Sequence, residues 1–163
     1  MAHQNGQLDQ AEQIYRSILS EQPDQAASLY LLGMLLHETQ RNSQAIACLE
    51  KAQSHCRENA DIHNGLCVAL MAAGENEKAI AAVREAIRLN PDLLQAYENY
   101  LNLAERCDDD ELRIEAIPAY LQLNPKRFDL RARLHQACLK LGRNERIVAA
   151  CVKLLDPDPN CVP

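Results

Sequence analysis

The stretch ADIHNGLCVALMAAGENEKAIAAVREAIRLNPDL, residues 60–93, determines the fold because it reads as two amphipathic helices joined by a tight turn. Apolar residues recur at helical spacing in both halves, which is typical of helices that bury one face. Gly74 stands where the first helix can end with a positive φ, and Asn76 can cap the second helix. Pro91 cannot extend that second helix, so the sequence predicts a helix, a turn, a helix and a stop.

The rest of the chain repeats this stretch at a shift of 34 residues, with no insertion or deletion. One column of the alignment closes the units and holds Pro23, Arg57, Pro91, Pro125 and Pro159. A second column falls in the turn between the two helices and holds Gly6, Gln40, Gly74, Asp108 and Gly142. A third column lies early in the second helix, with Ala11, Ala45 and Ala79 followed by Arg113 and Ile147. We therefore expect an array of helical pairs in which units four and five pack less regularly than unit three.

These columns resemble the tetratricopeptide repeat, whose period is 34 residues. The resemblance covers nearly the whole chain and implies an all-α fold, a right-handed α-solenoid of helix-turn-helix repeats. It implies one solenoid domain over residues 1–163, with a partial unit at 1–25 and full units at 26–59, 60–93, 94–127 and 128–161. The family shares an architecture and not one activity, so the fold alone does not name a function.

Composition favours an ordered, soluble chain, since 47% of the 163 residues are hydrophobic and 25% are charged. No apolar run approaches the roughly 20 residues that a membrane span needs, and the N-terminus lacks the basic and apolar regions of a signal peptide. Seven cysteines without CxxC spacing are scattered through the predicted helices, which is explained most simply by reduced thiols. We therefore expect a cytoplasmic protein with no membrane partner.

Charge is distributed unevenly along the chain, whose net charge is −6. Residues 1–125 hold 9 Lys and Arg against 19 Asp and Glu, whereas residues 126–146 hold 7 against 2. An acidic body with a basic fifth unit suits a bipolar partner, although solvated helix faces explain the same pattern. The basic stretch is short and offers only Phe128 for stacking on bases, so no nucleic-acid partner is expected.

No pattern in the sequence predicts catalysis, a cofactor or a metal site, and we expect a protein that is not an enzyme. None of the histidines adjoins a glycine-rich phosphate loop or a nucleophile elbow. The nearest approach to a metal cluster is Cys48, His55, Cys56, His63 and Cys67, but Cys67 takes the helix-packing position that Gly33 holds in unit two. The acidic run from Asp108 to Glu111 fits a helix N-terminus, because it lacks the alternating ligands and glycine of a calcium loop.

In arrays of this family the first helix of each pair lines a concave groove, and the resemblance implies that the groove binds a peptide or an extended segment of a partner protein. Helical spacing predicts which residues line it. They are Tyr30, Met34 and His37 in unit two, Asn64, Val68 and Met71 in unit three, Gln95, Glu98, Asn99 and Asn102 in unit four, and Arg133 and Gln136 in unit five. The groove is thus predicted to be apolar and adaptable toward the N-terminus and polar toward the C-terminus.

Other functions of the same fold stay open. Chaperone-binding members of the family clamp a terminal carboxylate with lysine, arginine and asparagine, but Ala27, Asp61, Asn64 and Gly65 hold the relevant positions here. Residues 6–38 are similar to the opening repeats of large bacterial proteins that carry a sulfotransferase-like domain or one like the O-linked N-acetylglucosamine transferases. The chain is alternatively the substrate-recruiting arm of such a transferase. A secretion-type chaperone is a second alternative, suggested by acidity and length.

Both ends of the chain predict that it is part of a longer protein. Met1 falls inside the first helix of a repeat, and a helix from Asn144 to Leu155 carries an apolar strip that includes Val148 and Val152. Because solenoids normally end in a unit with a polar outer face, we expect the isolated chain to self-associate through this strip.

Overall fold

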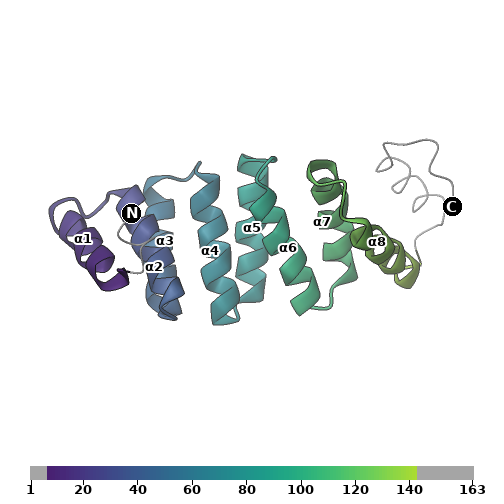
Figure 1. Cartoon of the computed structure of the whole chain (residues 1–163), viewed down its shortest axis with the longest axis horizontal. Coiled ribbons are helices and arrows are strands. Elements are labelled where there is room, and N and C mark those ends of the chain that lie inside the picture. The colour runs from purple at the N-terminus through teal and green to yellow at the C-terminus, as the bar shows by residue number, and fades with distance from the viewer. Residues whose placement is uncertain (1–6, 143–163) are drawn as a thin grey trace. The chain divides into compact units, whose positions relative to one another are not determined.

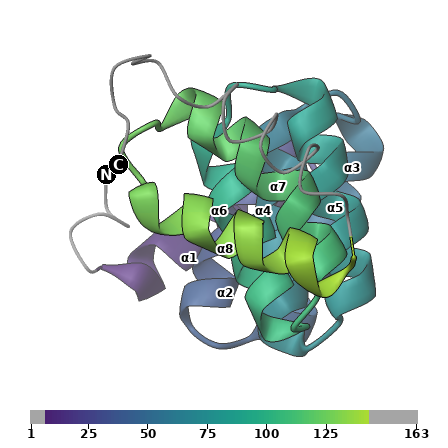
Figure 2. The same cartoon turned by 90° about the vertical axis from the view of Figure 1, so that its right-hand side faces the viewer.

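The structure, a computed structural model, describes residues 7–142. These residues form eight α-helices and no strand. Figure 1 labels the helices, and Figure 2 shows them after a quarter turn. The helices are α1 (Leu8–Glu21), α2 (Ala26–Glu38), α3 (Asn42–His55), α4 (Ala60–Ala73), α5 (Asn76–Leu89), α6 (Leu94–Arg106), α7 (Asp110–Leu123) and α8 (Phe128–Lys140). The stub before Gly6 and the apolar strip of Val148, Val152 and Leu155 lie outside the described residues.

The helices belong to two compact units, which divide between Leu93 and Leu94. The N-terminal unit contains α1 to α5, where each helix packs against the next and α2 also contacts α4. The C-terminal unit contains α6 to α8, where α7 packs against both α6 and α8. Since α2 and α4 are the first helices of successive pairs and touch, they form one surface, which we call the α2–α4 face.

The turns between paired helices repeat the same backbone conformation every 34 residues. Gln40, Gly74, Asp108 and Gly142 all have a positive φ, of 62°, 81°, 48° and 61°. Gly74 ends α4, and its N–H donates a hydrogen bond to the Met71 carbonyl oxygen at 3.1 Å. Left-handed φ is costly for residues with a Cβ, so its recurrence at Gln40 and Asp108 shows how strongly the paired helices impose this turn. The predicted turn column is confirmed at these four positions, whereas Gly6 lies outside the described residues.

The core between helices includes the alanines of the third column and large apolar residues next to them. Ala45 and Ala79 are fully buried, as are Leu49 and Val83 one turn later on the same helices. At Gly33 the backbone of α2 approaches α3 so closely that a Cβ would lie 2.6 Å from Leu49 Cγ. A side chain at that position would force the two helices apart, so the close packing predicted at Gly33 is confirmed.

One predicted cap is wrong. Asn76 is the first residue of α5 and not its cap, because the helix begins one residue earlier than expected, with Glu75 at the N-cap position. The side-chain caps that the structure shows lie at Asn59 and Asp109, which accept hydrogen bonds from the first N–H groups of α4 and α7. Between residues 7 and 142, no helix combines the length and the apolar content that crossing a bilayer requires.

Candidate functional site

The α2–α4 face is centred on Tyr30 and Met34, two partly buried side chains that α2 presents toward α4. A Cβ on Gly65 of α4 would lie 3.0 Å from Met34 Sδ and 3.0 Å from Tyr30 Cε2. Because Gly65 has no side chain, the Tyr30 ring and the Met34 thioether pack directly on the backbone of α4; we call this packing their seat on Gly65. Tyr30 and Met34, two of the residues predicted to line the groove, are thus brought together by Gly65, which the helical spacing did not identify.

Beside Tyr30 the surface opens into a hollow of about 430 Å³, which we call the Tyr30 hollow. Its lining comes from the first two turns of α2, the first turn of α4 and the segment between α3 and α4. It consists of Ala26, Ala27, Tyr30, Leu31, Cys56, Asn59, Asp61 and Ile62. Most of these side chains are apolar, and Leu31 is 38% exposed within an otherwise well-packed helix. A concave apolar site with a few polar groups is the usual form of a binding pocket.

Electrostatics at the Tyr30 hollow are set by Asp61. Burial raises the pKa of the Tyr30 hydroxyl above its ordinary value, and the negative charge of Asp61 raises it further. The Asp61 side chain is exposed, while its backbone N–H donates to Asn59 Oδ1 at 2.9 Å and begins α4. Near neutral pH the lining of the Tyr30 hollow therefore combines a neutral phenol with several apolar side chains and one carboxylate.

The other predicted residues of the N-terminal unit are partly buried but not all are available for binding. His37 Nδ1 lies 3.2 Å from Asn42 Oδ1, so the ring contacts the first residue of α3. Met71 Sδ lies 3.8 Å from Cys67 Sγ within α4. Asn64 and Val68 are partly buried on the same helix.

In the C-terminal unit, Glu98, Asn102 and Arg133 of the predicted set line one depression of about 240 Å³. The Tyr120 hydroxyl donates to Glu98 Oε1 at 3.4 Å in its wall. Gln136 lines a second hollow together with Arg133. Gln95 and Asn99 line neither, so the predicted polar set is only partly brought together.

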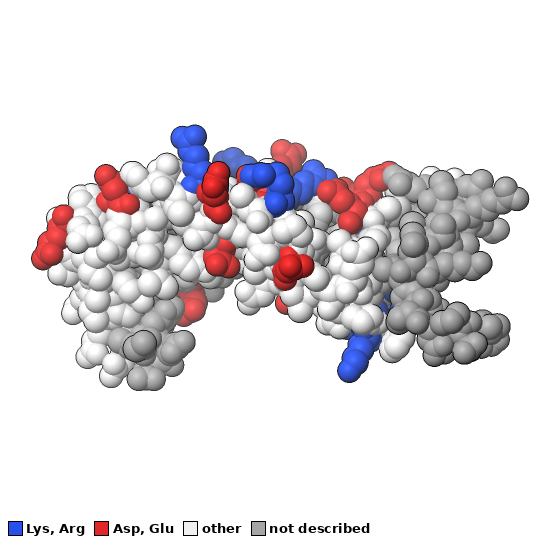
Figure 3. All heavy atoms as spheres, turned by 90° about the horizontal axis from the view of Figure 1, so that it is seen from above, with Lys and Arg blue, Asp and Glu red and all other residues white. Residues whose placement is uncertain are grey.

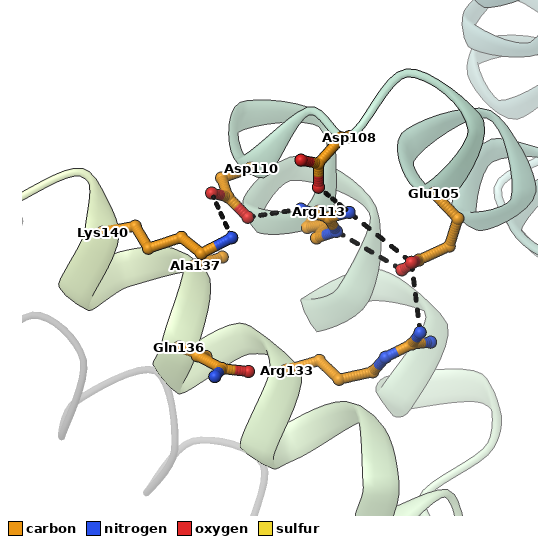
Figure 4. Close-up of a pocket in the computed structure, with 8 residues that line it drawn as sticks. All are labelled: Glu105, Asp108, Asp110, Arg113, Arg133, Gln136, Ala137 and Lys140. Carbon is orange, nitrogen blue, oxygen red and sulfur yellow. Dashed lines mark hydrogen bonds and ion pairs between the residues drawn. The ribbon is translucent and has the colours of Figure 1, made fainter.

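An ion-pair network surrounds Arg113, the residue that replaces alanine in the third column. Its guanidinium contacts Asp110 Oδ1 at 2.5 Å, Asp108 Oδ1 at 2.9 Å and Glu105 Oε1 at 3.3 Å. Figure 4 shows these carboxylates converging on it from α6, α7 and the turn between them. Two cations of α8 complete the network, with Arg133 Nη2 3.1 Å from Glu105 Oε2 and Lys140 Nζ 3.3 Å from Asp110 Oδ2.

Arg113 is 8% exposed, and its environment acts on its pKa in two directions. Desolvation lowers the pKa of Arg113, but hydrogen bonds to Asp108, Asp110 and Glu105 outweigh this and raise it above the ordinary value. The cation is therefore held charged against α6 and α7. Sequence reasoning missed this network, although an arginine in an alanine column preceded by four acidic residues was a usable signal. The acidic turn also supplies the Asp109 cap, as expected of a helix N-terminus.

Of the five residues considered as metal ligands, His63 and Cys67 are part of the core. His63 is buried, with Nε2 2.9 Å from the Arg57 carbonyl oxygen and Nδ1 3.1 Å from Gln53 Nε2. Cys67 is fully buried, and burial raises the pKa of its thiol to about 12. In the described part of the chain, no three histidine, cysteine or acidic residues are grouped for a metal ion.

The fold is similar to that of several solved proteins. The crystal structure of MamA matches with a TM-score of 0.75 at 21% identity, over 93% of this chain and 91% of that one. YrrB matches with a TM-score of 0.72 at 19% identity, over 97% and 82%. TTC0263, a thermophilic TPR protein of Thermus thermophilus, matches with a TM-score of 0.65 at 19% identity, over 98% and 87%. These likenesses support an all-α helical repeat solenoid.

Sequence comparison identifies the repeat. No curated protein matches the chain. Family models described as tetratricopeptide repeat match residues 2–55 and residues 60–93, which together make up more than half of the chain. The columns of turn and core residues recur at the same period in the structure. The chain therefore belongs to the tetratricopeptide repeat family.

Proposed function

We propose that the chain is a non-catalytic interaction module whose α2–α4 face binds an extended peptide segment of a partner protein. The observation that carries the proposal is the seating of Tyr30 and Met34 on Gly65, beside the mostly apolar Tyr30 hollow. The hollow accepts an apolar side chain of the peptide. The peptide backbone runs along the face toward the rest of α4, where Asn64 and Val68 lie.

Physical reasons favour these residues as anchors. Aromatic side chains bury a large area at low entropic cost and are enriched among the residues that dominate binding energy. Methionine is flexible and polarisable, so Met34 can adjust to different side chains. YrrB is described as a TPR protein with an unusual peptide-binding site, so this fold supports peptide binding in at least one other protein.

The C-terminal unit has a polar surface of its own. Asn102 is exposed in the wall of the depression that Glu98 and Arg133 also line. These groups suit hydrogen bonding to a peptide backbone better than they suit apolar insertion. We propose that Gln136, which lines a second hollow together with Arg133, extends this polar surface along α8.

The test is a selection of short random peptides displayed on phage against the whole chain, followed by affinity measurements on the enriched peptides. Replacing both Tyr30 and Met34 with alanine removes two central anchors, each worth more than about 1 kcal/mol in such interfaces. We expect affinity to fall by roughly 30-fold or more, with helicity unchanged by circular dichroism.

Ile14→Ala is the matched control, because Ile14 is a 50% exposed apolar residue on α1, outside the α2–α4 face. It should leave the affinity unchanged. Failure to enrich any peptide, or enriched peptides that bind the double variant as tightly as the parent, would count against the proposal.

A further inference from the structure

We infer that the peptide bound on the α2–α4 face carries a lysine or arginine beside the apolar side chain that enters the Tyr30 hollow. This inference rests on the proposed function, because it names the chemistry of the partner at the same site. It is carried by the distribution of charge among the helices of the N-terminal unit.

Neither α2 nor α4 contains a lysine or an arginine. All seven such residues between residues 1 and 93 lie on the second helices α1, α3 and α5 or in the turns, and they are Arg16, Arg41, Lys51, Arg57, Lys78, Arg84 and Arg88. The charged residues of α2 and α4 are the carboxylates Glu38 and Asp61, apart from histidines. Figure 3 shows one face of the molecule, on which both acidic and basic side chains lie among many uncharged ones.

Asp61 differs from several other carboxylates of the N-terminal unit. Carboxylates on the second helices pair with cations of the chain, as in the contacts of Glu12 with Arg41 at 2.5 Å and of Glu85 with Arg88 at 2.7 Å. Within residues 7–142, no lysine or arginine forms an ion pair with Asp61, although its side chain is exposed and lines the Tyr30 hollow. A carboxylate at the wall of an apolar site, on a face without cations, attracts a basic group of the partner and repels an acidic one.

Position also matters, because Asp61 and Tyr30 border the same hollow from opposite helices. A peptide side chain inserted next to Tyr30 places its sequence neighbours within reach of the Asp61 carboxylate. Lysine and arginine suit this place, since their long aliphatic stems can cover apolar surface such as Leu31 while the charged end stays in water.

The expected effect is modest because the pair is solvent-exposed. An exposed ion pair changes affinity by a factor of up to about 5, and exchanging the cation for an acid adds a repulsion of similar size. We therefore expect a lysine-bearing peptide to bind roughly 5- to 20-fold more tightly than its glutamate counterpart at low salt. The difference should shrink as added salt shortens the range of the interaction.

The experiment uses one peptide enriched by the phage selection and synthesised in three versions, with lysine, glutamine or glutamate next to the apolar residue. Affinities are measured for the parent chain and for Asp61→Asn, which removes the charge and keeps the shape. Asp9→Asn is the matched control, because Asp9 is an exposed aspartate in the first turn of α1. We expect the order lysine, glutamine, glutamate for the parent and for Asp9→Asn, and equal affinities for Asp61→Asn.

The outcomes separate this inference from the proposed function. If the three peptides bind the parent equally, or if Asp61→Asn keeps the preference for lysine, the inference is wrong. The proposed function still stands in that case, provided that the alanine variant of Tyr30 and Met34 loses affinity for all three peptides. If that variant binds all three as the parent does, the proposed function fails as well.

Discussion

The two buried glycines of α2 and α4 provide a matched test of the packing, because the same change to alanine meets different neighbours. At Gly33 the new Cβ would lie 2.6 Å from Leu49 Cγ, a branch point of a fully buried side chain, and 3.3 Å from the Ala45 carbonyl oxygen. At Gly65 the nearest atoms, at 3.0 Å, are the thioether sulfur of Met34 and the ring edge of Tyr30. The first neighbours cannot move without shifting α3, whereas the second are the ends of flexible, partly buried side chains.

The magnitudes follow from two opposing effects. Alanine in a helix interior is favoured over glycine by about 0.8 to 1 kcal/mol, and both positions gain this amount. Overpacking a well-filled core costs about 1 to 3 kcal/mol, which applies in full only at Gly33. We expect Gly33→Ala to lower the free energy of unfolding by about 1 kcal/mol, and Gly65→Ala to change it by less than about 0.5 kcal/mol or to raise it.

Urea unfolding followed by circular dichroism measures both variants against the parent. Gly65→Ala should also weaken peptide binding, since the added methyl group displaces the side chains of Tyr30 and Met34. Equal stability changes in the two variants, or a Gly33→Ala protein at least as stable as the parent, would refute the reasoning about close packing between α2 and α3.

Further predictions concern the C-terminal unit and the repeat itself. Arg113→Met should lower the free energy of unfolding by about 2 kcal/mol near neutral pH, since hydrogen bonds between charged groups contribute about 1.5 to 3 kcal/mol. The hydrogen bond from Arg113 holds the pKa of Asp110 below its ordinary value. The stabilisation is therefore present above about pH 4 and is lost as pH falls through the lowered pKa. Urea titrations from neutral to acid pH should show the free energies of unfolding of the parent and the variant converging. Gly74→Ala should cost about 1 kcal/mol in thermal unfolding, because φ is 81° there although no atom lies within 4 Å of the new Cβ. Ala79→Leu should cost about 1 to 3 kcal/mol by overpacking a fully buried site, and a variant as stable as the parent would contradict the assignment of that column.

Much of the fold could be predicted from the sequence because a tandem repeat displays each structural constraint several times. One glycine in a turn is weak evidence, but the column that contains Gly74 and Gly142 also contains Gln40 and Asp108, and all four adopt the same left-handed φ. The start of α5 was harder to place. Capping preference favours Asn76 over Glu75, but the start of a helix depends on where its first hydrogen bonds form, and α5 begins one residue earlier than that preference indicates.

The candidate site was predicted less completely, because spacing along one helix does not show what lies across from it. Tyr30 and Met34 were identified from helical spacing, yet their seat on Gly65 depends on the distance between α2 and α4. The Tyr30 hollow also uses Cys56 and Asn59 from a turn, which no helical periodicity includes. His37 was predicted by the same spacing as its neighbours, but its contact with Asn42 engages the ring within the chain.

The central claim is that a partner peptide binds on the face of the first helices, and chemical-shift mapping by heteronuclear NMR tests it most directly. An enriched peptide is titrated into the isotope-labelled chain, and the backbone amides that shift are assigned. We predict that the largest shifts fall on α2 and α4, around Tyr30, Met34, Asp61 and Gly65. Shifts concentrated on α3 and α5, with α2 and α4 unchanged, would contradict the account.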